Sequence, residues 1–176
     1  LEMKLAAAAA MAALDAGRQI LSVYETDFSV EHKADQSPLT LADQKAHQVI
    51  TQTLLPFGIP VLSEEGRNIA YEERKAWNRL WIVDPLDGTK EFVKRNGEFT
   101  VNIALVEAGA PVFGVVYWPV KDILYIGGRL TSGAWKVQNP STLFAGTDRG
   151  KPPVLRAGAL EAAEKLPRSH SKPSIF

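Results

Sequence analysis

The sequence predicts an α+β fold in which helices near the N-terminus pack on a mostly antiparallel sheet. Two helical patterns open the chain, and from residue 99 onward four strand-like runs follow one another at short spacing. Turn residues separate these runs, as expected for an antiparallel meander. With 176 residues, the chain is long enough for one domain with a sizeable core, or for one domain and the start of another.

Segment 4–25 is predicted to be a helix. Alanine, the best helix former, dominates its first half. Larger apolar side chains recur at a near-heptad spacing: Leu5, Leu14, Leu21 and Tyr24. From this near-heptad pattern we expect the helix to have one buried face.

The following segments alternate between short strands and helices. The predicted elements are a strand at 28–33, a helix from Thr40 or Asp43 to Pro56, a strand at 59–62 and a surface helix at 71–76. A buried strand at 80–83 then leads into the acidic turn Asp84-Pro-Leu-Asp-Gly88, which opens another helix.

The second half of the chain is predicted to be mostly strand. The four runs of the meander are 99–107, 112–118, 123–127 and 134–137. After a loop-rich stretch we expect one more strand to begin at Val154 and a short helix at 159–166. We therefore expect an N-terminal domain at 1–155 and the start of a truncated second domain at 156–176.

Composition excludes several classes of function. Lys and Arg number 20 and so do Asp and Glu, so no net charge attracts a nucleic acid polymer, and any phosphate recognition must be local. The chain has no cysteine, which excludes disulfides, thiolate zinc sites and cysteine nucleophiles. Its longest apolar run, residues 5–14, is too short to span a bilayer, so we expect a cytoplasmic protein without a transmembrane segment.

The acidic turn has the composition of a site for cations and phosphate. Pro85 biases Asp84 toward extended geometry at the end of the strand, and Asp87 falls where an N-cap carboxylate belongs. The backbone N–H groups of Gly88 and Thr89 would then point outward with the positive end of the helix dipole. The alternative is an ordinary polar turn with no ligand.

Glu64 follows one predicted strand as Asp84 follows another. If those strands are neighbours, Glu64, Asp84 and Asp87 converge, and three carboxylates repel one another unless cations intervene. Oxygen ligands without cysteine or a histidine pair favour Mg²⁺ over zinc, and the Leu86 carbonyl offers one more oxygen. The alternative is that Glu64 is a solvated loop acid.

Several stretches resemble the inositol monophosphatase superfamily. They are Ser37–Gln44 (SPLTLADQ), Ser63–Gly66 (SEEG), Trp81–Phe92 (WIVDPLDGTKEF) and Arg95–Leu105 (RNGEFTVNIAL). The Lys-Glu-Phe and Asn-Gly-Glu-Phe segments are similar to those of the CysQ-type 3'(2'),5'-bisphosphate nucleotidases. The resemblance covers most of residues 1–170, and it implies a layered sugar-phosphatase fold whose C-terminal α/β domain is largely absent here.

The resemblance also implies residue roles. Glu64, Asp84 and the Leu86 carbonyl would bind one Mg²⁺, and Asp84 with Asp87 a second. The implied catalytic residues are Asp43, Glu64 and Thr89, of which Thr89 and Asp43 would orient and help deprotonate the attacking water. The implied substrate-binding residues are Glu64, Leu86, Asp87, Gly88 and Thr89.

The activity implied by the resemblance is Mg²⁺-dependent removal of the 3'-phosphate of 3'-phosphoadenosine 5'-phosphate, a step of sulfur metabolism that gives AMP and phosphate. One alternative is an inositol- or sugar-phosphate phosphatase. The other is a truncated, non-catalytic metal- or phosphate-binding module, because the family's further aspartate, usually in a Trp-Asp pair, has no counterpart here. A homodimer and peripheral association with the inner membrane are left open.

Overall fold

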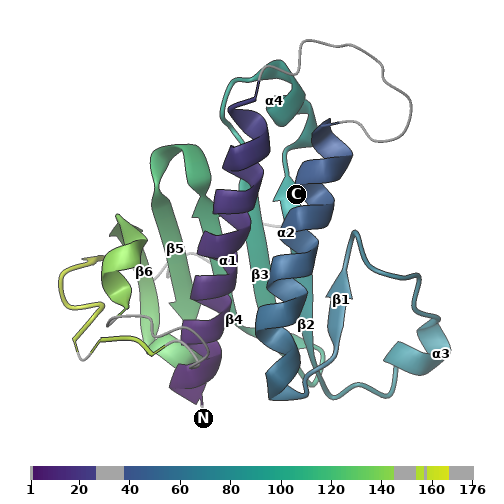
Figure 1. Cartoon of the computed structure of the whole chain (residues 1–176). Helices are drawn as coiled ribbons and strands as arrows, with labels where there is room; N and C mark the ends of the chain where they lie inside the picture. The colour runs from purple at the N-terminus through teal and green to yellow at the C-terminus, as the bar shows by residue number, and fades with distance from the viewer. Residues whose placement is uncertain (1, 27–37, 145–153, 157, 167–176) are drawn as a thin grey trace, which may run out of the picture.

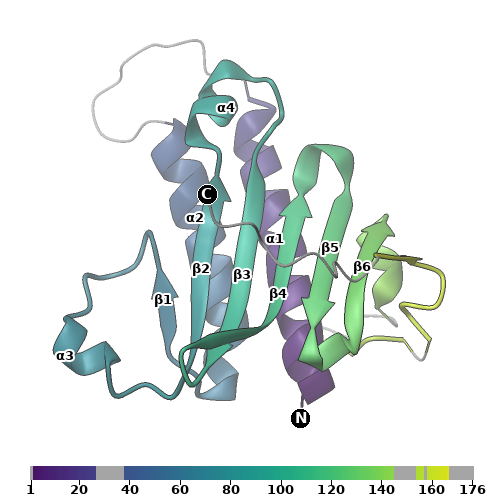
Figure 2. The ribbon, with the colours of Figure 1, turned by 180° about the vertical axis from the view of Figure 1, so that it is seen from behind.

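The computed structural model describes residues 2–26, 38–144, 154–156 and 158–166. In this part of the chain, two long helices, α1 (Glu2–Tyr24) and α2 (Pro38–Leu54), lie side by side on one face of a seven-stranded sheet (Figure 1). Seen from behind, the other face of the sheet has no described helix over it (Figure 2). The predicted α+β class, with N-terminal helices packed on the sheet, is confirmed.

The strands follow one another across the sheet in chain order. They are β1 (Val61–Ser63), β2 (Arg79–Asp87), β3 (Thr100–Glu107), β4 (Ala110–Trp118), β5 (Ile123–Gly128), β6 (Gly133–Gln138) and β7 (Glu164–Lys165). β1 pairs with β2 in parallel, and each later pair is antiparallel. The sheet is therefore mostly antiparallel, as predicted.

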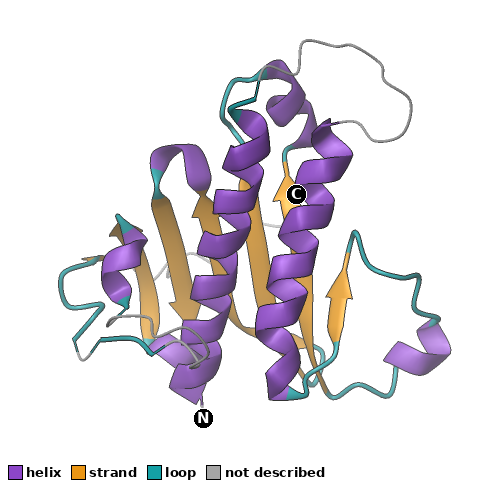
Figure 3. Cartoon of the chain, in the orientation of Figure 1, coloured by secondary structure: helices purple, strands orange, loops and turns teal. Residues whose placement is uncertain are grey.

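Short helices connect the strands (Figure 3). α3 (Tyr71–Arg74) lies between β1 and β2, and α4 (Thr89–Lys94) between β2 and β3. Four short 3-10 helices complete the described elements: η1 (Leu55–Phe57), η2 (Pro119–Lys121), η3 (Arg129–Thr131) and η4 (Pro140–Leu143). The predicted strand at 28–33 lies outside the described residues.

The core lies between the helices and the sheet. In β3, Val101, Ile103 and Leu105 are buried and alternate with half-buried residues, the pattern of a strand covered on one face. The prediction of a single buried face on α1 is too narrow, because consecutive alanines at 6–10 are all fully buried between α2 and the sheet. Neither α1 nor any other described helix is long and apolar enough to cross a membrane.

Two predictions for the end of the chain are wrong. Residues 159–166 form tight turns and then β7, not a helix, because Glu164 and Lys165 pair with β6 and Gly158 has a positive φ of 69°. Leu155 makes an isolated bridge with Phe144 instead of opening a strand. The open edge of β6 thus decides the local structure of this segment. The division into domains at residue 155 stays a prediction.

Gly17 marks a close approach between α1 and the sheet. A Cβ atom at this position would lie 2.8 Å from Tyr117 Cδ1 and 3.1 Å from Pro119 Cγ. The Tyr117 ring has little freedom to retreat, since it is buried and its hydroxyl donates to Asp122 Oδ1 at 2.8 Å. Burial, and then this hydrogen bond, raise the pKa of Tyr117, so the hydroxyl keeps its proton.

Gly17→Ala should therefore lower the free energy of unfolding by about 1–3 kcal/mol, the usual cost of overpacking. In an open helix the same change is stabilising by about 1 kcal/mol. Urea denaturation measures the difference. Ser22→Ala, at an exposed position of the same helix, is the matched control and should change stability by less than about 0.5 kcal/mol. Stabilisation by Gly17→Ala would contradict the close contact.

Candidate active site

The parallel pairing of β1 and β2 brings two acidic residues to the same edge of the sheet. Ser63 is in register with Val83, and the Glu64 N–H donates to the Val83 carbonyl at 3.1 Å. The next residue on β2 is Asp84, so Glu64 and Asp84 lie on adjacent strands at that edge. The predicted neighbourhood of the two strands is confirmed.

The acidic turn differs from its prediction in one respect. β2 does not end near Asp84 but continues through a bulge to Asp87, which pairs with Thr100. Asp87 is therefore not the N-cap of α4, and its Oδ2 accepts a hydrogen bond from Asn102 Nδ2 at 2.9 Å instead. β2 continues past Pro85, where a break is expected, because the antiparallel ladder with β3 supplies hydrogen-bond partners.

Gly88 occupies the N-cap position of α4 in place of Asp87. Its φ of +99° lies in the left-handed region, and a Cβ atom there would lie 2.8 Å from the Glu98 carbonyl oxygen. Phe92 N–H bonds back to the Gly88 carbonyl at 2.9 Å, which closes the first turn. The N–H groups that precede it, beginning with that of the exposed Thr89, have no partner within the helix.

An aromatic cluster holds α4 against the rest of the fold. The rings of Tyr24, Phe92 and Phe99 lie with centroids 5.0–5.4 Å apart and at steep angles to one another. The Arg95 guanidinium lies 5.7 Å from the centre of the Tyr24 ring and also donates to the Thr26 carbonyl. The end of α1 thereby holds the middle and the C-terminal end of α4, the helix that follows the acidic turn.

Asp43 lies on α2, and its carboxylate interacts with those at the ends of the neighbouring strands. Its side chain is buried, with 7% of the residue exposed. Burial, followed by the charges of Glu65, Asp84 and Glu64, raises the pKa of Asp43 to about 7. The neighbours responsible are all acidic, so α2 delivers Asp43 into a region of negative potential.

Asp84 has a similarly perturbed environment. Burial and the charges of Glu64 and Asp87 raise its pKa to about 6, with a smaller contribution from Glu65. The Leu86 N–H, which donates to Asp84 Oδ1 at 3.2 Å, opposes this increase. We call Asp43, Glu64, Glu65, Asp84 and Asp87 the acidic cluster.

The donors of the acidic cluster fit a hard divalent cation. They are carboxylate oxygens that repel one another, which is the environment that Mg²⁺ relieves. Among the described residues, no three acidic or histidine side chains are gathered closely enough to hold a metal ion as they stand. Glu64 and Asp87 are exposed, and their side chains are therefore free of tight packing.

Two members of this region were not predicted from the sequence. The sequence assigns Glu65 no role beyond its place in the Ser-Glu-Glu-Gly segment, yet of the neighbouring charges it contributes most to raising the pKa of Asp43. Asn102 pairs with Asp84 in the ladder, and its side chain reaches past the bulge of β2 to Asp87. Its Oδ1 accepts from Thr100 Oγ1 at 3.1 Å. The Glu-Glu doublet was a visible signal, whereas the Asn102 contact depends on sheet register.

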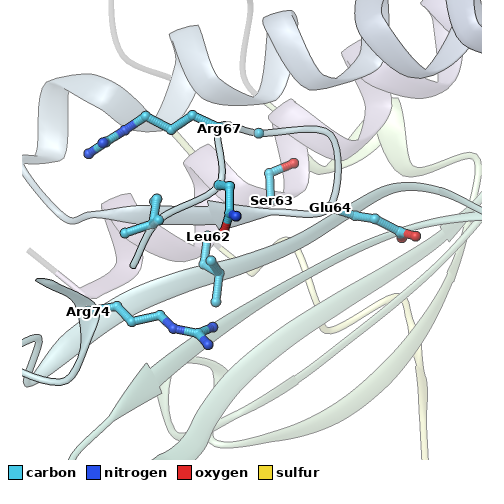
Figure 4. Close-up of a pocket in the computed structure, with 8 residues that line it drawn as sticks. Leu62, Ser63, Glu64, Arg67 and Arg74 are labelled. Atoms are coloured by element: carbon cyan, nitrogen blue, oxygen red, sulfur yellow. The ribbon is translucent and has the colours of Figure 1, made fainter. Parts of the chain in front are cut away.

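A pocket of about 300 Å³ opens beside β1, and Glu64 is the member of the acidic cluster that lines it (Figure 4). Leu62, Ser63 and Glu64 line it from the strand, and Arg67 and Arg74 from the segment that follows. Arg67 Nη2 forms an ion pair with Glu73 Oε1 at 2.6 Å. Basic side chains therefore flank the cluster at the Glu64 end.

Comparisons with known proteins connect this geometry to a family. The chain is 54% identical over 129 residues to the 3'(2'),5'-bisphosphate nucleotidase CysQ of Salmonella typhimurium, which covers 70% of this chain and 51% of that protein. CysQ of Shigella flexneri is 47% identical over 148 residues, covering 81% of this chain and 58% of that protein. The chain thus spans about half the length of these curated relatives.

Solved structures show the same relationship. CysQ from Bacteroides thetaiotaomicron superposes with a TM-score of 0.80 at 47% identity, covering 97% of this chain and 60% of that one. Inositol monophosphatase II from Staphylococcus aureus superposes with a TM-score of 0.63 at 28% identity, covering 76% and 49%. The family model of the inositol monophosphatases matches residues 2–162. The chain belongs to the inositol monophosphatase family.

Proposed function

We propose that this chain is the metal- and phosphate-binding part of a Mg²⁺-dependent phosphatase that removes the 3'-phosphate of 3'-phosphoadenosine 5'-phosphate, giving AMP and phosphate. The observation that carries the proposal is the acidic cluster, in which like charges and burial raise the pKa values of Asp43 and Asp84. Relatives named as bisphosphate nucleotidases support the substrate class.

In this proposal the strand ends hold the cations. Glu64, Asp84 and the Leu86 carbonyl would hold one Mg²⁺, and Asp84 and Asp87 would hold a second. Bound Mg²⁺ supplies positive charge that offsets the phosphate ester and lowers the pKa of water. Glu64 and Asp87 are exposed, so their side chains would be accessible to a cation.

In this proposal, the start of α4 binds the phosphate and Asp43 takes part in proton transfer. The Gly88 and Thr89 N–H groups, free of partners within the helix, donate to phosphate oxygens. The Thr89 hydroxyl orients the attacking water, and Asp43 takes up its proton. Asp43 is a buried carboxylate beside the other acids of the cluster, and in this proposal it acts as the general base.

Two other functions remain as candidates, each for a specific reason. An inositol- or sugar-phosphate phosphatase is favoured by the shared fold of the Staphylococcus aureus inositol monophosphatase. A non-catalytic metal- or phosphate-binding module is the other candidate, because the acidic cluster offers cation ligands whether or not a bound ester is hydrolysed.

Phosphate release separates these three functions. The protein with Mg²⁺ should release phosphate from 3'-phosphoadenosine 5'-phosphate faster than from inositol 1-phosphate, and chelation of Mg²⁺ should stop both reactions. Preference for the inositol ester would contradict the proposed substrate. Release from neither ester, with Mg²⁺ binding retained, would support the module.

Asp84→Asn should reduce phosphate release by about 100-fold or more, because loss of groups that only orient metal ligands already costs 10–100-fold. Steady-state assays at saturating Mg²⁺ measure the change. Asp15→Asn is the matched control: Asp15 pairs with Arg18 on α1, away from the acidic cluster, and its replacement should leave the rate unchanged. Equal rates for the two variants would exclude Asp84 from the cation site.

Asp43→Asn should stabilise the protein in the absence of Mg²⁺. The raised pKa means that the folded state binds more protons than the unfolded state between about pH 4 and pH 7. Wild-type stability therefore falls as pH rises through this window, and the variant escapes that loss. At pH 8 we expect a gain of about 1–2 kcal/mol after allowance for solvent screening, disappearing near pH 4. Urea denaturation across this pH range is the measurement, and a gain that grows toward low pH would contradict the cause.

A further inference from the structure

His47 makes a contact that the proposed function does not use. It lies on α2 one turn after Asp43, and its Nδ1 is 2.8 Å from Ser63 Oγ in a hydrogen bond. The two residues are sixteen positions apart, and Ser63 is buried. The bond therefore links the helix that carries Asp43 to the strand that leads into Glu64.

Ser63 is the base of a tight turn that presents two acids of the cluster. The Gly66 N–H donates to the Ser63 carbonyl at 3.0 Å, so the turn contains Glu64 and Glu65. On the side of the sheet, the Glu64 N–H bonds to the Val83 carbonyl. Ser63 is thus tied by its backbone to the turn and by its side chain to α2.

The directions of the side chains make this tie consequential. Figure 4 shows Ser63 and Glu64 pointing in different directions at the end of β1. β1 ends at Ser63 and Glu64 is the first residue of the turn, so holding the Ser63 side chain restrains the backbone from which Glu64 leaves. Asp43 and His47, four residues apart, lie on one face of α2. A single helix face therefore supplies one acid directly and orients two others.

We propose that His47 is a positioning residue of the cation site: by holding Ser63, it directs Glu64 and Glu65 toward Asp43 and Asp84. This inference rests on the proposed function, in which the acidic cluster binds Mg²⁺. His47 itself touches no ligand. Groups that orient metal ligands through hydrogen bonds contribute about 10–100-fold to metal affinity.

His47→Ala should weaken Mg²⁺ binding by about 10-fold or more in isothermal titration calorimetry. It should also speed amide hydrogen exchange at Gly66, whose N–H closes the turn. Ser63→Ala should have the same two effects, and the double variant should lose little more than either single one, because both remove one bond. Gln48→Ala, at an exposed neighbouring position on α2, is the matched control and should change neither quantity.

Replacement by asparagine or glutamine tests the atom involved. Asparagine places a polar atom near the position of Nδ1, so His47→Asn should restore part of the Mg²⁺ affinity, whereas His47→Gln should not. A general structural role for His47 would make all three replacements equivalent and would overturn the inference. Should His47→Ala fail to fold, Ser63→Ala removes the same bond by losing a single oxygen.

The outcomes distinguish this inference from the proposed function. Unchanged Gly66 exchange in both His47→Ala and Ser63→Ala overturns the positioning role, whatever the Mg²⁺ result. If the wild-type protein binds no Mg²⁺, the proposed function fails and the positioning of a cation site fails with it. If the wild type binds Mg²⁺ and the variants bind it equally well, only the inference is overturned.

Discussion

The parallel pairing of β1 with β2 is the constraint on which the candidate site depends. It aligns Ser63 with Val83, so the acidic residue after each strand segment emerges at the same edge of the sheet. The other strand pairs are antiparallel, and that arrangement would send Glu64 to the opposite edge from Asp84. α2 then adds Asp43 over the same edge. One strand direction, set by three residues of β1, thus gathers the carboxylates.

Gathering these carboxylates opposes the stability of the fold. Burial and like charge raise the pKa values of Asp43 and Asp84, which means that the ionised folded state is disfavoured relative to separated acids in water. Packing elsewhere in the fold offsets this loss of stability. The rings of Tyr24, Phe92 and Phe99 hold α4 against the end of α1, and the alanines of α1 close the core against α2 and the sheet. Functional sites commonly hold such unfavourable arrangements on a rigid scaffold.

Sequence patterns predict whatever depends on local periodicity. The strand succession from 99 onward and the meeting of Glu64 with Asp84 follow from alternation and from strand ends. Features that depend on a distant partner are not visible in this way. β2 runs past Pro85 because β3 offers hydrogen bonds, and 164–165 becomes a strand because β6 has an open edge. The hydrogen bond between His47 and Ser63 joins α2 to β1, and no spacing of residues in the sequence indicates it.

The described sheet ends in its two shortest strands, β1 with three residues and β7 with two. Outer strands expose unpaired backbone N–H and C=O groups that can template association with a further chain. Because β1 and β7 are short, they expose few such groups. At the β1 border, Glu64 and Glu65 add negative charge, which would face the same charge on a second copy approaching edge to edge. The same carboxylates that form the candidate site would therefore oppose pairing between two copies at this edge.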